Sequence, residues 1–225
     1  MPNLWVRIIS GGGIMKKEVT ELVKKMYDLG IDIEDCIFSL QTAFIYNSST
    51  PLKDCAARTA NISSSEGYLT SRIAELAKEN PEIAPYISIP GHMLKISESV
   101  ENLSGLIQKK IKENMLFSDR VAMETCFLLQ RLIDMATPMA DVILARNRIL
   151  SYYVQESQKG VMRRAIEYST FHEERLIEGF QHPASLLYIK TLDAIKAIAW
   201  HSKEIAMKLT EGVIEKLSHI HNVSE

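Results

Sequence analysis

Histidine and cysteine are the residue types in this chain that most readily bind metal or act as nucleophiles. A dinuclear metal site in a helical protein would need histidines in Glu-x-x-His pairs, and the sequence contains six histidines but no such pair. The histidines closest together are His219 and His221, near the end of the chain. The three cysteines form no Cys-x-x-Cys pair, which argues against a zinc site or a disulfide framework and favours a reducing cytoplasm.

Motifs for nucleophilic catalysis and phosphate binding are absent from the sequence as well. There is no Gly-x-Ser-x-Gly, no Gly-x-x-x-x-Gly-Lys-Ser/Thr and no Gly-x-Gly-x-x-Gly. The glycine run at residues 11–13 precedes a helical pattern, but it lacks the preceding strand and the lysine of a phosphate-binding loop. We therefore predict a flexible tail over residues 1–14 and no enzymatic activity.

The composition is that of a globular protein, and its charge balance argues against nucleic acid as a partner. Of the 225 residues, 46% are apolar and 24% are charged, and 26 basic and 28 acidic side chains leave a net charge of −2. Because this balance produces no extended basic field, nucleic acid is not a predicted partner. No run of about 18 apolar residues occurs, so no transmembrane segment is predicted.

Apolar residues recur at three- and four-residue steps, a spacing that places them on one face of an α-helix. The pattern predicts an all-α protein with six long helices at about residues 15–46, 52–78, 89–115, 120–154, 158–178 and 183–217. Ser118 and Asp119 are candidate N-caps of the fourth helix, and Pro138 is expected to kink it. No segment shows the period-two alternation of a strand.

Two halves of the sequence match each other at a constant offset. Ile96 and Ile198 stand 102 positions apart, as do Leu103 and Ile205, and the same offset aligns the apolar residues of the first and fourth helices. We infer two tandem three-helix bundle repeats related by pseudo-two-fold symmetry. The predicted organisation is a flexible tail at 1–14, a first repeat at 15–115, a second repeat at 119–217 and a frayed tail at 218–225.

The third and sixth helices carry a likeness to a known family. The stretches from Ile96 to Leu103 and from Ile198 to Ala206 resemble the two signatures of PhoU-type phosphate-uptake regulators. Each signature reads roughly Leu-Glu-Arg-Ile-Gly-Asp-His-Ala-x-Asn-Ile-Ala, and in the family the two acids four residues apart bind metal ions. The resemblance implies the PhoU fold over most of the chain.

Three of the four acidic positions of these signatures are not acidic in this chain. In the first copy the acids fall on Leu94 and Glu98, and in the second they fall on Lys196 and Trp200. A hard cation needs about six oxygen ligands, so one retained acid cannot build the metal cluster of the family. We therefore expect no metal site and no cofactor, with Glu98 as the only retained acid.

The same helices are predicted to carry a protein-contact surface instead. We assign it Glu98, Glu101, Lys196, Trp200 and His201, because an exposed tryptophan among polar groups is common at interface hot spots. The alternative interpretation is that Trp200 packs into the core while Lys196 extends beside it to solvent.

The resemblance implies a non-enzymatic regulator or adaptor of phosphate uptake or phosphate signalling. Members of the family contact a phosphate transporter subunit or a sensor kinase, so we expect a cytoplasmic protein, peripheral at the inner face of the membrane, that can form a homodimer. Two alternatives stay open at this point. One is a metal-binding helical-bundle protein or enzyme, and the other is a helical interaction module no longer tied to phosphate.

Overall fold

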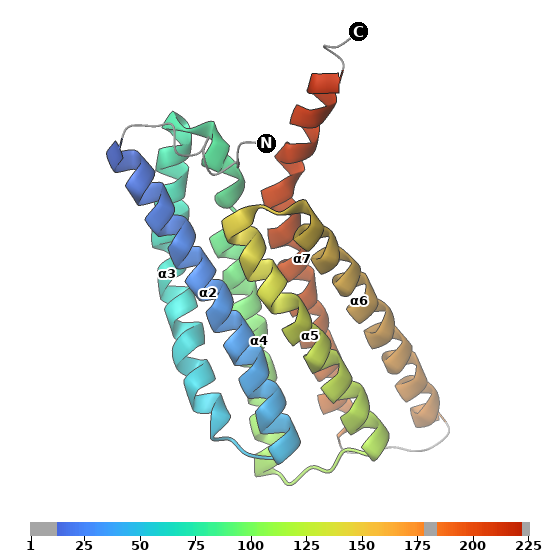
Figure 1. The fold of residues 1–225 in the computed structure, drawn as a ribbon. Helices are drawn as coiled ribbons and strands as arrows, with labels where there is room; N and C mark the ends of the chain where they lie inside the picture. Colours follow the sequence, from blue (N-terminus) through green and yellow to red (C-terminus); the bar gives the residue numbers. More distant parts are fainter. Residues whose placement is uncertain (1–12, 178–183, 222–225) are drawn as a thin grey trace.

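The structure, a computed structural model, describes the backbone of residues 13–177 and 184–221 and the side chains of residues 17–174 and 184–211. Within these ranges the regular structure is entirely helical, which confirms the predicted all-α class (Figure 1). The elements are α2 (Gly13–Tyr46), α3 (Pro51–Glu79), the short 3₁₀ helix η1 (Pro81–Tyr86), α4 (Ile89–Lys112), α5 (Asp119–Ala145), α6 (Arg148–Ile177) and α7 (Ser185–His221).

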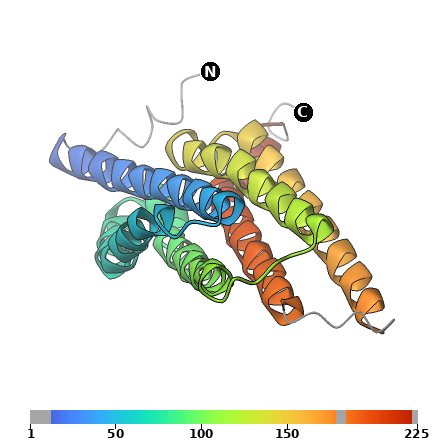
Figure 2. The same cartoon turned by 90° about the horizontal axis from the view of Figure 1, so that it is seen from below.

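The helices form two three-helix units, α2 to α4 and α5 to α7, that pack side by side (Figures 1 and 2). Between the units, α2 packs most extensively on α5 and α4 on α7, whereas α3 and α6 lie at the two outer edges. Exchanging α2 with α5, α3 with α6 and α4 with α7 preserves these principal pairings. This arrangement confirms the predicted pseudo-two-fold symmetry.

The aligned apolar residues of α4 and α7 belong to the hydrophobic core. We call this set the seam; it includes Ile96, Leu103, Ile198 and Ile205. Ile96 and Leu103 on α4 and the equivalent Ile198 and Ile205 on α7 are fully buried, as the repeat predicts. Burying an aliphatic side chain of this size contributes about 1.5–3 kcal/mol relative to exposure. The periodic residues that define the repeat are therefore part of the buried core.

The predicted continuous helix over 120–154 is wrong, because α5 ends at Ala145 and a separate helix, α6, follows it. Arg146 adopts a left-handed conformation with φ of 47°, and its N–H donates to the Val142 carbonyl, which ends α5. The Asn147 side-chain oxygen then accepts hydrogen bonds from the N–H groups of Ile149 at 2.8 Å and Leu150 at 3.3 Å, which caps α6. The predicted fifth helix from 158 consequently begins ten residues earlier, at Arg148.

Other boundaries differ from the prediction by smaller amounts. The segment between the second and third predicted helices contains η1, and α4 itself ends at Lys112 rather than near 115. Ser118 caps α5 as predicted, since its hydroxyl accepts from the Val121 N–H at 3.4 Å. The helical backbone of α7 continues past 217 to His221, and α5 runs through Pro138, where the kink stays a prediction. Residues 1–12 of the predicted tail, like 222–225, lie outside the described ranges.

Among the described residues, no helix combines the length and the apolar character that crossing a membrane requires.

Candidate functional site

The four signature positions lie on α4 and α7, which pack against each other between the repeats. Glu98 is exposed on α4, and its carboxylate is 2.8 Å from Nζ of Lys95, one turn earlier. Lys196 is half-buried on α7, and its ammonium group is 2.7 Å from a carboxylate oxygen of Asp193. Leu94 is half-buried. The two charged residues at these positions are thus each paired within their own helix.

Trp200, at the second acidic position of α7, lies on the surface. It is 47% exposed, and Nζ of Lys203 lies 4.2 Å from the centroid of its ring. Lys203 is in turn 3.0 Å from a carboxylate oxygen of Glu204. A cation over the face of an indole is attracted by the ring quadrupole, so this pair favours the observed position of Trp200 by about 0.5–1 kcal/mol. The structure therefore excludes the interpretation of Trp200 as a core residue.

His201 faces α4 and meets His92 there. The two Nδ1 atoms are 3.1 Å apart and the ring centroids are 5.4 Å apart. Burial lowers the pKa of both imidazoles, and in each case the charge of Glu204 acts in the opposite direction. Two neutral imidazoles can share this hydrogen bond with one as donor and the other as acceptor. The pair thus joins α4 to α7, at a sequence separation of 109 that no local pattern reveals.

Four of the five residues predicted for the contact surface are brought together by α4 and α7, and one is not. The charge of Glu98 acts on the pKa of His201, which places these two side chains near each other. Glu101 is exposed, but its charge acts on Cys55 of α3, so it lies toward the outer helix. We define the α4–α7 face as Glu98, Lys196, Trp200, His201 and Lys203; the sequence analysis missed the last of these.

A metal ion needs several histidine, cysteine or carboxylate ligands that converge on one point. No group of three or more histidine, cysteine, aspartate or glutamate side chains converges in the described part of the chain. The side chains of His219 and His221 lie outside the described residues, so nothing tests them. The absence of a metal site stays a prediction.

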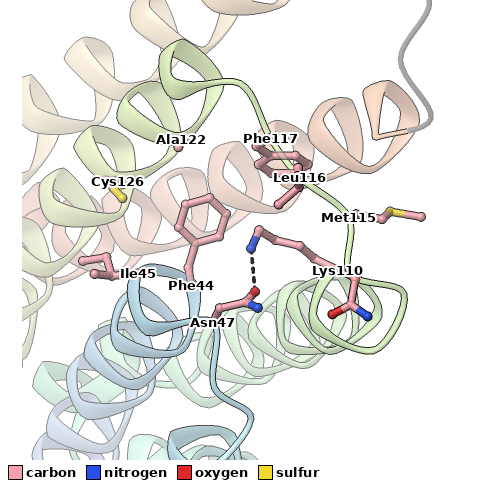
Figure 3. Close-up of a pocket in the computed structure, with 10 residues that line it drawn as sticks. Phe44, Ile45, Asn47, Lys110, Met115, Leu116, Phe117, Ala122 and Cys126 are labelled. Atoms are coloured by element: carbon pink, nitrogen blue, oxygen red, sulfur yellow. Dashed lines mark hydrogen bonds between the residues drawn. The ribbon is translucent and has the colours of Figure 1, made fainter.

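A second feature, which the sequence analysis missed, is a pocket of about 440 Å³ at the junction of the two repeats (Figure 3). Its walls come from the ends of α2 and α4, the connection that follows α4, and the start of α5. The residues that line it are Phe44, Ile45, Asn47, Lys110, Asn114, Met115, Leu116, Phe117, Ala122 and Cys126. The pocket therefore exists only because the two repeats pack together.

Lys110 is the charged residue of this lining set. Its ammonium group donates to the Asn47 side-chain oxygen at 2.8 Å, drawn as a dashed line in Figure 3. The same group lies 5.2 Å from the ring centroid of Phe44 and 5.9 Å from that of Phe117. Burial lowers the pKa of Lys110. In the sequence, Lys110 looks like one of several lysines that complement the helix dipole in a last turn, so no local signal distinguishes it.

Comparison with solved structures identifies several that share this architecture. PhoU from Pseudomonas aeruginosa matches with a TM-score of 0.77 and 15% identity, over 86% of this chain and 95% of that chain. The phosphate transport system regulatory protein PhoU from Streptococcus pneumoniae matches with a TM-score of 0.75 and 10% identity, over 87% and 94% of the two chains. A PhoU-like protein from Shewanella oneidensis matches with a TM-score of 0.58 and 14% identity, over 86% and 99%.

Comparisons at the level of sequence give a different result. No protein-family model matches this chain, and no curated protein matches it either. Structural similarity at 10% to 15% identity shows the fold. We conclude that this chain has the PhoU fold over most of its length.

Proposed function

We propose that this chain is a non-enzymatic regulator of phosphate uptake or phosphate signalling that acts by contact with another protein. The observation that carries the proposal is the match of both three-helix repeats to PhoU from Pseudomonas aeruginosa, with a TM-score of 0.77 over 95% of that chain. The Streptococcus pneumoniae relative is described as a phosphate transport system regulatory protein, which supports the same process here.

The α4–α7 face is the contact surface in this proposal. Trp200 supplies a large side chain that is 47% exposed, and Lys203 lies 4.2 Å from the centroid of its ring and adds a positive charge beside it. Aromatic anchors surrounded by polar groups provide much of the affinity at protein interfaces. The proposed partner is a subunit of a phosphate transporter or a sensor kinase, which would place the protein at the inner face of the membrane.

The metal chemistry of the fold is proposed to be lost at these positions. An ammonium group at Lys196 repels a cation where an acid would bind it, and Asp193 already neutralises that ammonium at 2.7 Å. Glu98 likewise forms an ion pair, with its carboxylate 2.8 Å from Nζ of Lys95. Elemental analysis of untagged protein, purified without chelators, should find no stoichiometric iron, zinc or manganese. A full equivalent of any of these would contradict the proposal.

The function can be tested by deleting the gene in its natural host and measuring uptake of radiolabelled phosphate in phosphate-rich and phosphate-poor medium. We expect deletion to abolish the decrease in uptake that normally follows phosphate supply, and the wild-type gene to restore it. The variant Trp200→Ala should fail to restore regulation because it removes the aromatic anchor.

The matched control is Tyr68→Ala on α3. Tyr68 is 59% exposed and has Nζ of Lys25 at 5.7 Å from its ring centroid, so it repeats the aromatic and lysine pair outside the α4–α7 face. We expect Tyr68→Ala to restore regulation fully. Unchanged phosphate uptake after deletion would overturn the proposed function, and full restoration by Trp200→Ala would overturn the assignment of the contact surface.

A further inference from the structure

We propose that the pocket between the two repeats is a binding site for a small amphipathic carboxylate, meaning an apolar body that carries one carboxylate group. At about 440 Å³, the pocket falls within the size range of small-molecule sites, about 300–1,000 Å³. Its lining also has the usual make-up of such sites, with mostly apolar walls and a few polar groups that converge. The inference does not depend on a role in phosphate regulation.

The charge of the ligand is inferred from Lys110. An ammonium group has three donors, and the hydrogen bond to the Asn47 side-chain oxygen at 2.8 Å uses one of them. Among the described residues, no carboxylate forms an ion pair with Lys110. Partly removing a cation from water without a counter-ion costs free energy, which an incoming anion would recover.

The chemical type of the anion follows from the number of positive charges. Among the residues that the structure describes, Lys110 is the only cation that lines the pocket, and the polar lining residues Asn47 and Asn114 are neutral amides. A phosphate dianion would need more charge and more donors than this set offers, whereas a carboxylate matches one ammonium group with an amide beside it.

The apolar body follows from the walls around the ammonium group. The rings of Phe44 and Phe117 flank it, with their centroids 5.8 Å apart and their planes inclined by 48°. Leu116 extends the apolar lining along the connection after α4, whereas the side chain of Met115, which also lines the pocket, points away from the Lys110 ammonium group in Figure 3. A phenyl or alkyl group in this space would contact the rings while its carboxylate reaches Lys110.

Binding can be tested with 4-phenylbutanoate and its uncharged counterpart 4-phenylbutanamide, using titration calorimetry on the full chain. Cys126 supplies a second measurement, because it lines the pocket and is partly accessible, whereas Cys36 and Cys55 are buried. An occupied pocket should slow alkylation of Cys126. The variants are Lys110→Met and, as the matched control, Lys109→Met, whose exposed side chain lies on the same helical turn outside the pocket.

We expect the carboxylate to bind at least about tenfold more tightly than the amide, as a charge-assisted hydrogen bond predicts. Lys110→Met should remove that preference and the protection of Cys126, and Lys109→Met should keep both. Equal affinity for the two compounds, equal behaviour of the two variants, or no binding up to the solubility limit of 4-phenylbutanoate would each overturn the assignment. Concentration-dependent dimerisation blocked by Lys110→Met would overturn it as well, because a second copy would then occupy the pocket.

Discussion

Replacing Gly30 by alanine tests how closely the two repeats pack, because this residue lies on α2 against α5. A Cβ atom placed on Gly30 would lie 3.0 Å from the Cβ of Ala140 and 3.4 Å from its Cα. The atoms it meets are backbone or attached directly to backbone, so no side-chain rotation can relieve the contact. The substitution therefore forces α2 and α5 apart, or strains both helices.

Two opposing terms set the size of the effect. Alanine is favoured over glycine in a helix interior by about 1 kcal/mol, whereas overpacking a well-packed core costs about 1–3 kcal/mol. Gly30→Ala should therefore lower the free energy of unfolding by about 0–2 kcal/mol. Gly105→Ala on α4 is the control, because its added Cβ would meet no heavy atom within 4 Å beyond its two chain neighbours and the backbone of its own helix. It should gain the helix-propensity term alone and stabilise the protein by about 0.5–1 kcal/mol.

Urea unfolding followed by far-ultraviolet circular dichroism measures both free energies in the same helical protein. For a chain of this length, each kcal/mol also corresponds to about 2–4 °C in the thermal midpoint, so the two variants should shift that midpoint in opposite directions. If Gly30→Ala proved as stable as Gly105→Ala, the contact between α2 and α5 would be looser than described, and the reasoning would fail.

Three further predictions rest on the seam and the α4–α7 face. Truncating Leu103 or Ile205 to alanine should each lower the free energy of unfolding by about 2–5 kcal/mol, because both are fully buried; an unchanged urea midpoint would contradict this. Trp200→Ala should lower it by about 1.5–2.5 kcal/mol, roughly half the cost of truncating a buried tryptophan, because the side chain is 47% exposed; unfolding at room temperature would refute that. Burial lowers the folded-state pKa of His92 and His201, so the unfolded chain binds more protons as pH falls through its usual histidine value of about 6.5. Stability measured by urea unfolding should decrease from pH 7.5 toward pH 5, and replacing both histidines by glutamine should flatten this dependence.

The sequence by itself predicted the helices and the repeat, because both depend on local periodicity. Apolar residues at three- and four-residue steps mark the buried face of a helix, and this spacing recurs at a constant offset in the two halves. Leu103 and Ile205 could therefore be assigned to the buried seam from the sequence alone. The boundary between the fourth and fifth helices could not be found in this way. The apolar pattern continues past Arg146, whose left-handed backbone is accompanied by a hydrogen bond from its Nε to the Leu209 carbonyl at 2.7 Å, on a helix distant in sequence.

The features of the candidate sites depend on the tertiary structure, because each joins residues that local spacing cannot relate. His92 and His201 meet across 109 positions, and Lys110 reaches Asn47 across 63. Whether Trp200 faces solvent or core was also open in the sequence, since a helical position defines a direction only relative to the helices around it. The packing of α4 on α7 decided that direction, and the packing of α2 on α5 placed the pocket between the repeats.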